Sequence, residues 1–344
     1  MRKFVGFERG VNLGGWLSQF DEYSEEHFES FITEEDIKTI ASWGLDHVRV
    51  PVDYSVIETD DGTPIAKGYE YLDKCLMWCR KYGIHMIIDI HAAYGYNFDP
   101  LAKTDKEIFF HDEALQEHYY EFWRHISRHF CNDYEDVAYE LLNEIVPFTV
   151  VNEWNEIALK TIAAIREDSP KSWIVFGGVC YNAVSSVAGL ADAHDEKVVH
   201  TFHCYEPMIF THQGAYWVKG MPLDFRTNYP VSMEDIDRML TELPPELAKA
   251  IDREYFKITG PEFFEKIFAE AIKASEERNI PLYCGEYGVI DKADMPNTLN
   301  WLRDISAALN NHGIARSYWN YKSKDYEICG ERCKDYIDEL TKLL

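Results

Sequence analysis

The stretch Val137-Ala138-Tyr139-Glu140-Leu141-Leu142-Asn143-Glu144 carries an apolar run into a carboxylate, and Leu282-Tyr283-Cys284-Gly285-Glu286-Tyr287-Gly288 does the same. Each run is typical of a buried strand, and each final glutamate stands where that strand should leave the core. A carboxylate at that place contributes little to packing and is well placed for chemistry. Most glutamates are simply solvated, so either residue alone would be read as a surface side chain. The pattern of the whole chain decides between these interpretations.

Short apolar runs alternate with longer helical patterns along the chain. The runs predict strands at residues 10–13, 47–50, 84–90, 137–142, 173–177, 197–202, 282–285 and 315–319, with Pro51 closing the second. Helical periodicity falls between them, at about residues 33–42, 69–82, 112–130, 152–168, 261–278 and 295–311. Eight apolar strands alternating with helical segments predict an α/β protein with a closed (β/α)8 TIM barrel. A doubly wound open sheet is the competing fold, but no G-x-G-x-x-G follows the first strand.

The domain organisation follows from the length of the chain and the spacing of its strands. We expect residues 1–344 to form a single barrel domain, since α/β barrels reach this size. About 50 residues separate Tyr205 from Pro261, where barrel loops usually take about two to six. This segment is rich in aromatic residues and has helical patterns at 232–243 and 245–255. We therefore expect residues 207–260 to form a small, mostly helical lid over the active-site face, after the sixth strand.

The charge of the chain excludes several classes of partner. Sixty acidic residues against 34 Lys and Arg give a formal net charge of −26. Such a surface repels nucleic acid, anionic membranes and polyanionic sugars such as pectin, but not a neutral polymer. No run is long enough to span a membrane, and the first residues lack the apolar core of a signal peptide. We expect a cytoplasmic protein, or one whose leader is missing from this chain.

The eight cysteines do not predict a disulfide framework or a metal site. Several lie within apolar patterns, as small buried hydrophobic residues do. Two pairs have i, i+4 spacing, but neither has a matching Cys or His pair at zinc-finger spacing. No glycine loop typical of phosphate binding is present. We therefore predict neither a metal nor a cofactor.

Polar and aromatic residues stand at the carboxyl ends of the predicted strands, where barrel enzymes carry their catalytic groups. The set is Asn12, Arg49, His91, Asn143, Glu144, His203, Tyr205, Glu286 and Trp319. Each member alone has a structural interpretation: Arg49 as an ion pair across the barrel mouth, the histidines and Trp319 as core residues. Their joint placement at one end of one barrel favours a functional site.

The ordered set Arg49, His91, Asn143-Glu144, His203-x-Tyr205, Glu286 and Trp319 resembles glycoside hydrolase family 5, a cellulase-type family with retaining chemistry. The resemblance extends from Gly10-Val11-Asn12-Leu13-Gly14-Gly15-Trp16 to Trp319-Asn320-Tyr321, nearly the whole chain. Ala92 departs from the family pattern, because many members carry a second histidine there. This departure leaves the sugar contacts near the third strand open.

The resemblance implies a role for each member of the set. Glu144 would be the general acid/base and Glu286 the nucleophile, kept ionised by Arg49 and Tyr205. Asn143 would hold the sugar 2-hydroxyl, while His91 and His203 would bond the sugar or fix the carboxylates. Trp319 would offer its flat face to the sugar at the cleavage position. Further candidates for substrate binding are Asn12, Trp16, Phe20, Tyr54, Tyr94, Tyr96, Trp217 and Lys322.

The function implied is a retaining endo-β-1,4-glucanase that cuts cellulose-like or mixed-linkage glucan by double displacement, with carboxyl groups about 5 Å apart. We expect a monomer whose partner is a β-glucan. Exo-β-1,3-glucanase and β-mannanase remain alternatives, since the opening at residues 9–17 also resembles the exo-β-1,3 branch. A metal-dependent amide or phosphoester hydrolase is disfavoured because no histidine lies near Asn12. A non-catalytic sugar-binding barrel is the remaining alternative.

Overall fold

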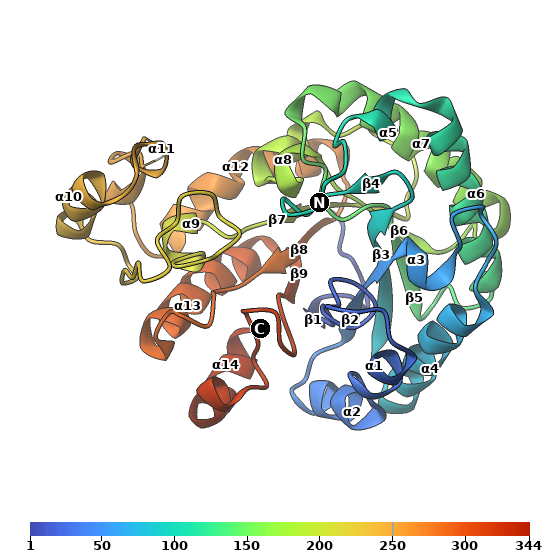
Figure 1. Cartoon of the computed structure of the whole chain (residues 1–344), viewed down its shortest axis with the longest axis horizontal. Coiled ribbons are helices and arrows are strands. Elements are labelled where there is room, and N and C mark those ends of the chain that lie inside the picture. The colour runs from blue at the N-terminus through green and yellow to red at the C-terminus, as the bar shows by residue number, and fades with distance from the viewer. Residues whose placement is uncertain (250) are drawn as a thin grey trace.

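The computed structural model describes residues 1–249 and 251–344 and confirms the closed (β/α)8 barrel (Figure 1). Eight parallel strands pair in a ring, which the contact between β2 and β3 closes. They are β1 Arg9–Asn12, β2 His47–Asp53, β3 His85–Ala93, β5 Val137–Glu140, β6 Trp173–Phe176, β7 Val198–His203, β8 Leu282–Tyr287 and β9 Ala315–Tyr318. A two-residue strand, β4 Tyr96–Asn97, folds back antiparallel on β3.

Helices form the outer layer of the barrel. The long ones are α4 Ala66–Tyr82, α6 Glu113–His129, α7 Val151–Asp168, α12 Pro261–Arg278 and α13 Met295–His312, close to the predicted bounds. Shorter ones are α1 Glu25–Ser30, α2 Glu34–Ser42, α3 Tyr54–Ile57, α5 Ile108–His111, α9 Met208–Thr211 and α14 Ile337–Leu343. After β6 the layer has only α8 Val179–Asn182 and the 3-10 helix Val184–Gly189. No helix in the described part of the chain has the length and apolar character that crossing a membrane requires.

Pro51 does not close the second strand, contrary to the sequence prediction. The β2 backbone continues to Asp53, pairing with β3 throughout. The Leu13 amide donates to the Arg49 carbonyl, and the Asp53 amide donates to the Leu17 carbonyl. Alternate residues of a strand turn their backbone groups to the same neighbour, so Pro51, between Arg49 and Asp53, also faces the β1 side. There β1 has already ended at the Gly14-Gly15 turn, and no ladder bond requires the missing N–H of proline.

The amino end of the barrel is filled by apolar side chains. Phe4 and Phe7 stack with ring centroids 4.7 Å apart beneath the strands. They pack with residues near the strand beginnings: Ile87, Ala138, Trp173, Val175, Val199, Tyr283 and Ala315. A larger apolar layer lies between strands and helices and includes five of the eight cysteines: Cys75, Cys79, Cys204, Cys284 and Cys333. One polar pair is buried at the amino end, where His47 Nε2 lies 3.0 Å from the Tyr283 hydroxyl.

The insertion between β7 and α12 is less helical than predicted. It contains α9, α10 Met233–Glu242, α11 Pro245–Ala248 and the 3-10 helix Tyr255–Lys257, joined by irregular segments. The predicted helix at 245–255 ends at Ala248, and position 250 within it lies outside the described residues. Figure 1 shows α10 and α11 beyond α12 and α13, away from the strand ends. The two helices therefore extend from the side of the barrel.

Candidate active site

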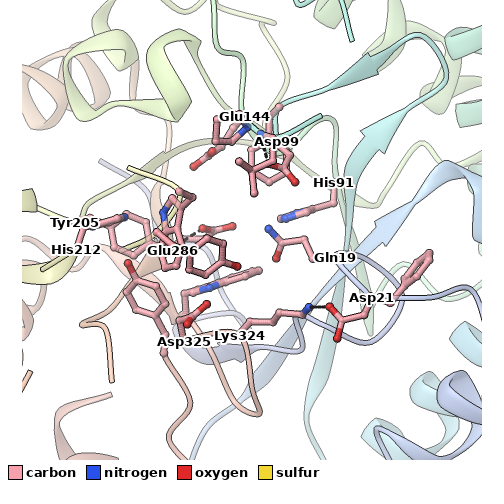
Figure 2. Close-up of a pocket in the computed structure, with 18 residues that line it drawn as sticks. Gln19, Asp21, His91, Asp99, Glu144, Tyr205, His212, Glu286, Lys324 and Asp325 are labelled. Carbon is pink, nitrogen blue, oxygen red and sulfur yellow. Dashed lines mark hydrogen bonds and ion pairs between the residues drawn. The ribbon is translucent and has the colours of Figure 1, made fainter. Parts of the chain in front are cut away.

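Glu144 and Glu286 come from opposite sides of the barrel and meet in one cavity. Glu144 follows β5, and Glu286 lies within β8. An oxygen of each carboxylate lies within 4.8 Å of the other, and both side chains point into the cavity (Figure 2). Their residues are only 9% and 5% exposed. Retaining glycosidases hold their two carboxyl groups about 5 to 5.5 Å apart, whereas inverting enzymes need about 6.5 to 9.5 Å.

Two donors hold the Glu286 carboxylate. Arg49, fully buried at the centre of the barrel, donates from Nη1 to Oε1 at 2.8 Å. The Tyr205 hydroxyl donates to Oε2 at 2.9 Å. Both bonds favour the ionised carboxylate and fix its orientation. Glu286 therefore has the surroundings of a nucleophile.

Beneath Glu286, Arg49 binds two further buried carboxylates that the sequence prediction did not include. Glu140 accepts from Nε at 2.7 Å and from Nη2 at 2.9 Å, a bidentate pair. Asp89 Oδ2 lies 3.1 Å from Nη2. Arg49 also donates to the amide oxygens of Asn12 and Asn143, each at 2.8 Å. A signal was present in the sequence, because Asp89 and Glu140 are charged residues inside otherwise apolar runs.

The Glu144 side is held by a histidine and a tyrosine. His203 Nδ1 lies 2.7 Å from Glu144 Oε1 and 3.6 Å from Glu286 Oε2, so one ring contacts both carboxylates. The Tyr96 hydroxyl donates to the backbone carbonyl of Glu144 at 2.7 Å and accepts from the Val146 amide at 2.9 Å. These bonds fix the chain where it carries Glu144 into the cavity.

Burial and charge separate the two carboxylates in their proton affinity. Burial, and then the neighbouring Glu286 charge, raise the pKa of Glu144 well above its ordinary value. Burial also raises the pKa of Glu286, but Arg49, His91 and the Tyr205 hydrogen bond oppose that rise. The surroundings therefore favour the proton on Glu144 over Glu286. This is the division of roles that acid-assisted nucleophilic attack requires.

The histidines of the site are neutral. Burial lowers the pKa of His203 well below its usual value and that of His91 to about 3. His91 Nδ1 bonds Asp89 Oδ2 at 2.7 Å, which leaves Nε2 without a protein partner. Figure 2 shows this ring pointing into the cavity. Asn143 Nδ2 is likewise buried without a partner. Both nitrogens are free to bond the hydroxyl groups of a bound ligand.

Trp319 forms one wall of the cavity and is 6% exposed. Its ring lies parallel to that of His91, with a centroid distance of 5.7 Å and an interplanar angle of 1°. Gly14 permits this position, because a Cβ atom there would fall 2.5 Å from the indole ring. The Gly14-Gly15 turn thus has a direct role in shaping the site.

The cavity has a volume of about 460 Å³, enough for a short run of sugar units. Among the predicted residues, its lining includes Glu144 and Glu286 together with Phe20, His91, Tyr205, Trp217 and Trp319. The sequence prediction missed the remaining lining residues: Gln19, Asp21, Phe98, Asp99, Pro100, Leu101, His212, Tyr216, Lys324, Asp325 and Tyr326. These lie on loops whose path the strand pattern does not specify.

Four predicted substrate contacts lie below or beside the site. Asn12 is fully buried, and its side-chain amide donates to the Gly285 carbonyl at 3.0 Å, so it positions Arg49 rather than substrate. Trp16 is 1% exposed and faces a different cavity. Tyr96 is buried with its hydroxyl group engaged by backbone. Lys322 donates to the Phe31 carbonyl at 2.8 Å.

Tyr54 and Tyr94 also lie outside the lining of the cavity. Their rings meet edge to face with a centroid distance of 5.6 Å, and Tyr94 stacks on His118 at 4.7 Å. The Tyr54 hydroxyl donates to Asp60 at 2.9 Å. Both rings are thus occupied by protein neighbours. Aromatic character alone did not separate such residues from those of the cavity.

Within the described residues, one cluster has the spacing of metal ligands. Single ligand atoms of Glu144, His203 and Glu286 all lie within 4.8 Å of one another. These are the groups that the proton chemistry would use, and Arg49 already neutralises the Glu286 charge at 2.8 Å. A cation there would compete with that ion pair. The cluster is better suited to handling a proton than to holding a resident metal.

A (β/α)8 barrel with two carboxylates at this spacing, one held by arginine and tyrosine, has the site of a retaining glycosidase. The family model described as cellulase (glycosyl hydrolase family 5) matches residues 9–325. The chain belongs to this family.

Relatives of known name resemble the chain along nearly its whole length. Endoglucanase C of Acetivibrio thermocellus is 39% identical over 343 residues, covering 99% of this chain and 98% of the relative. Cellodextrinase A of Ruminococcus flavefaciens is 39% identical over 316 residues, covering 92% and 86%. The crystal structure of an endoglucanase from Thermotoga maritima is 22% identical with a TM-score of 0.75, covering 98% and 97%. At 22% identity, the likeness to the Thermotoga maritima structure concerns the fold alone.

Proposed function

We propose that the protein is a retaining endo-β-1,4-glucanase that hydrolyses internal bonds of cellulose-like or mixed-linkage β-glucans by double displacement. The observation that carries the proposal is the approach of Glu144 and Glu286 oxygens to within 4.8 Å in one cavity. The named relatives, an endoglucanase and a cellodextrinase, support a β-1,4-glucan as substrate.

In the first step Glu286 attacks the anomeric carbon of the sugar while Glu144 gives its proton to the departing glycosidic oxygen. The C–O bond to the leaving sugar breaks, and an ester bond forms between the anomeric carbon and Glu286. Arg49 and Tyr205 hold Glu286 ionised and oriented before attack. Asn143 Nδ2, buried without a protein partner, is positioned to bond the sugar 2-hydroxyl as positive charge develops on the ring.

In the second step Glu144 takes a proton from water, whose oxygen attacks the anomeric carbon and releases Glu286. The ester removes the Glu286 charge, one of the causes that raise the pKa of Glu144. That pKa therefore falls once the ester has formed, and the acid becomes a base. Neutral His203 supports both states, because Nδ1 can accept from the protonated carboxyl or donate to the ionised one.

The insertion contributes to the cleft through its first part. His212, Tyr216 and Trp217 line the cavity, whereas no described residue of 219–260 does. We assign a covering role to the segment that carries these three aromatic side chains, within a single catalytic domain. We also propose that the enzyme is a monomer. Gel filtration with light scattering would measure the oligomeric state.

Product analysis tests the proposed function. Proton NMR during cleavage of cellopentaose should show the β anomer first, with the α anomer appearing only by later mutarotation. Rates on carboxymethylcellulose, barley glucan, laminarin and mannan should rank the two β-1,4-glucosidic polymers first. An α first product would refute the double displacement. Preference for laminarin or mannan would refute the substrate assignment.

A further inference from the structure

Thr211 is a fully buried residue at the end of α9, the first helix of the insertion. Its hydroxyl group donates to the backbone carbonyl of Tyr205, and its own carbonyl accepts from the Ile290 amide at 3.0 Å. Tyr205 holds the Glu286 carboxylate, and Ile290 lies four residues after Glu286 in the chain. One buried threonine therefore joins the segment that carries Tyr205 to the segment that carries the nucleophile.

The same hydroxyl group contacts the ring beside Tyr205. His212 Nδ1 lies 3.0 Å from Thr211 Oγ1. The Thr211 hydroxyl gives its single proton to the Tyr205 carbonyl, so its oxygen accepts at this contact and His212 Nδ1 carries a proton. Burial lowers the pKa of His212 to about 4, so the ring is neutral. It meets the Tyr205 ring edge to face with a centroid distance of 5.1 Å. Tyr205 is thus held at its backbone by Thr211 and at its ring by His212.

The bond to the Tyr205 carbonyl has no substitute in the structure. Within the described residues, no other group donates to this oxygen. A valine at position 211 would fill the space of the threonine and leave the carbonyl without its donor, which is costly inside a protein. We expect the segment to move until the carbonyl regains a partner. The Tyr205 hydroxyl, now 2.9 Å from Glu286 Oε2, would move with it and weaken that bond.

The proton affinity of Glu286 depends on several neighbours. Burial raises its pKa, whereas Arg49, His91 and the Tyr205 hydrogen bond oppose the rise. Within the described residues, Thr211 bonds only one of the groups that face this carboxylate, Tyr205. A lost Thr211 hydroxyl would therefore reach Glu286 through Tyr205. The titratable and charged groups that face Glu286 from the surrounding elements are Arg49, Asp89, His91, Glu144, His203, Tyr205 and Tyr326.

We propose that Thr211 is a positioning residue that holds the Tyr205 hydroxyl at hydrogen-bond distance from the nucleophile Glu286. The inference rests on the proposed function and gives the start of the insertion a second task besides covering the cleft. Catalytic groups must be held within about 0.5 Å of their working geometry, and supporting hydrogen bonds supply that precision. Thr211 supplies one of these bonds from a helix that lies outside the regular alternation of strands and helices.

The pH profile of kcat/KM on a soluble cello-oligosaccharide tests this role. Thr211→Val removes the hydroxyl group and keeps the volume, so the acidic limb should move upward by about half to one pH unit. This is less than the shift from removing the Tyr205 hydroxyl itself, because the bond to Glu286 is weakened and not deleted. The basic limb, which reports Glu144, should stay in place. Thr211→Ser keeps the hydroxyl group and should restore the wild-type profile.

Control variants make the test specific. Thr161→Val is the matched control, because Thr161 is also fully buried and its hydroxyl donates to the Ile157 carbonyl at 2.8 Å within α7. Its acidic limb should stay at the wild-type pH. Thr211→Ala removes the same hydroxyl with a smaller side chain and should reproduce the shift, so the test does not depend on the folding of one variant. Tyr205→Phe/Thr211→Val should have the acidic limb of Tyr205→Phe alone, since the positioned hydroxyl is already gone.

The other outcomes overturn the proposal. An acidic limb at the wild-type pH, or an equal loss of kcat/KM at every pH, would show that Thr211 only stabilises the fold. A double variant whose limb moves beyond that of Tyr205→Phe would show that Thr211 does not act through the Tyr205 hydroxyl.

Failure of the proposed function has a separate signature. Wild-type enzyme that does not cleave cello-oligosaccharides would refute the glucanase. Carbon-13 NMR of the Glu286 carboxyl group would then still test Thr211. A higher pKa of Glu286 in Thr211→Val than in wild type would support the positioning role, and an equal pKa would overturn it.

Discussion

Removing one hydroxyl group, by Tyr205→Phe, should shift the pH dependence of the enzyme. The Tyr205 hydroxyl donates to Glu286 Oε2 at 2.9 Å in a buried site. A hydrogen bond to a charged group contributes about 1.5 to 3 kcal/mol. At about 1.4 kcal/mol for each pKa unit, its loss should raise the pKa of Glu286 by about one to two units.

The direction of this pKa shift depends on which protonation state of Glu286 the Tyr205 hydroxyl stabilises. The bond favours ionised Glu286 and is one of the causes that lower the pKa of this carboxyl. Its loss makes Glu286 take up a proton at higher pH. The acidic limb of kcat/KM, which reports the free enzyme, should therefore move upward by about one to two pH units.

The assay is the pH profile of kcat/KM for wild type and Tyr205→Phe on a soluble cello-oligosaccharide. Tyr326→Phe is the matched control, because its buried hydroxyl has no protein partner and its ring lies 5.7 Å from that of Tyr205. The control should leave the acidic limb in place. An acidic limb that remains at the wild-type pH or moves to lower pH in Tyr205→Phe would refute the role given to this hydrogen bond.

Three further predictions test other parts of the site. Glu140→Gln removes a charge that raises the pKa of Glu144, so the basic limb of kcat/KM should move to lower pH. The substitution also weakens the buried pair with Arg49, so the free energy of unfolding, measured with denaturant, should fall by about 1 to 3 kcal/mol. An unmoved basic limb would contradict this. Glu144→Gln should cut kcat/KM for cellopentaose by about 10²- to 10⁴-fold, yet spare glycosylation by dinitrophenyl cellobioside, whose leaving group needs no proton; equal losses on both would refute the acid role. Dialysis against EDTA should leave kcat/KM unchanged, whereas a loss restored by a metal ion would favour metal-dependent hydrolysis.

The sequence was sufficient to predict the barrel and the centre of the site. The strands leave an apolar pattern, and the carboxyl ends of parallel strands must converge at one rim. Arg49, Glu144, His203, Tyr205 and Glu286 could therefore be placed together before their contacts were known. Their mutual distances in the structure, 2.7 to 2.9 Å for the bonds between them, follow from that convergence.

The strand bounds were less predictable where local and tertiary preferences differ. Proline normally interrupts a strand, but Pro51 faces the position where β1 has turned away. Nothing within the second run itself shows that its neighbour ends there. The same limit applies to the helix predicted at 245–255, where only Pro245–Ala248 is helical in the described residues.

The outer cleft was not predictable from residue type. Lys322 bonds the Phe31 carbonyl, whereas Lys324, two residues later, lines the cavity and pairs with Asp21 at 3.0 Å. The choice between them depends on a loop whose backbone has positive φ at Lys324. Loop conformation, not composition, determines these contacts.

Trapping the covalent intermediate tests the central claim most directly. A 2-deoxy-2-fluoro-β-cellobioside with a dinitrophenyl leaving group should inactivate the enzyme by forming a stable ester, because the fluorine slows the second step. Mass spectrometry of the digested protein should place a single fluorocellobiosyl group on Glu286. A label on another residue, or full turnover of natural substrate by Glu286→Gln, would contradict the account.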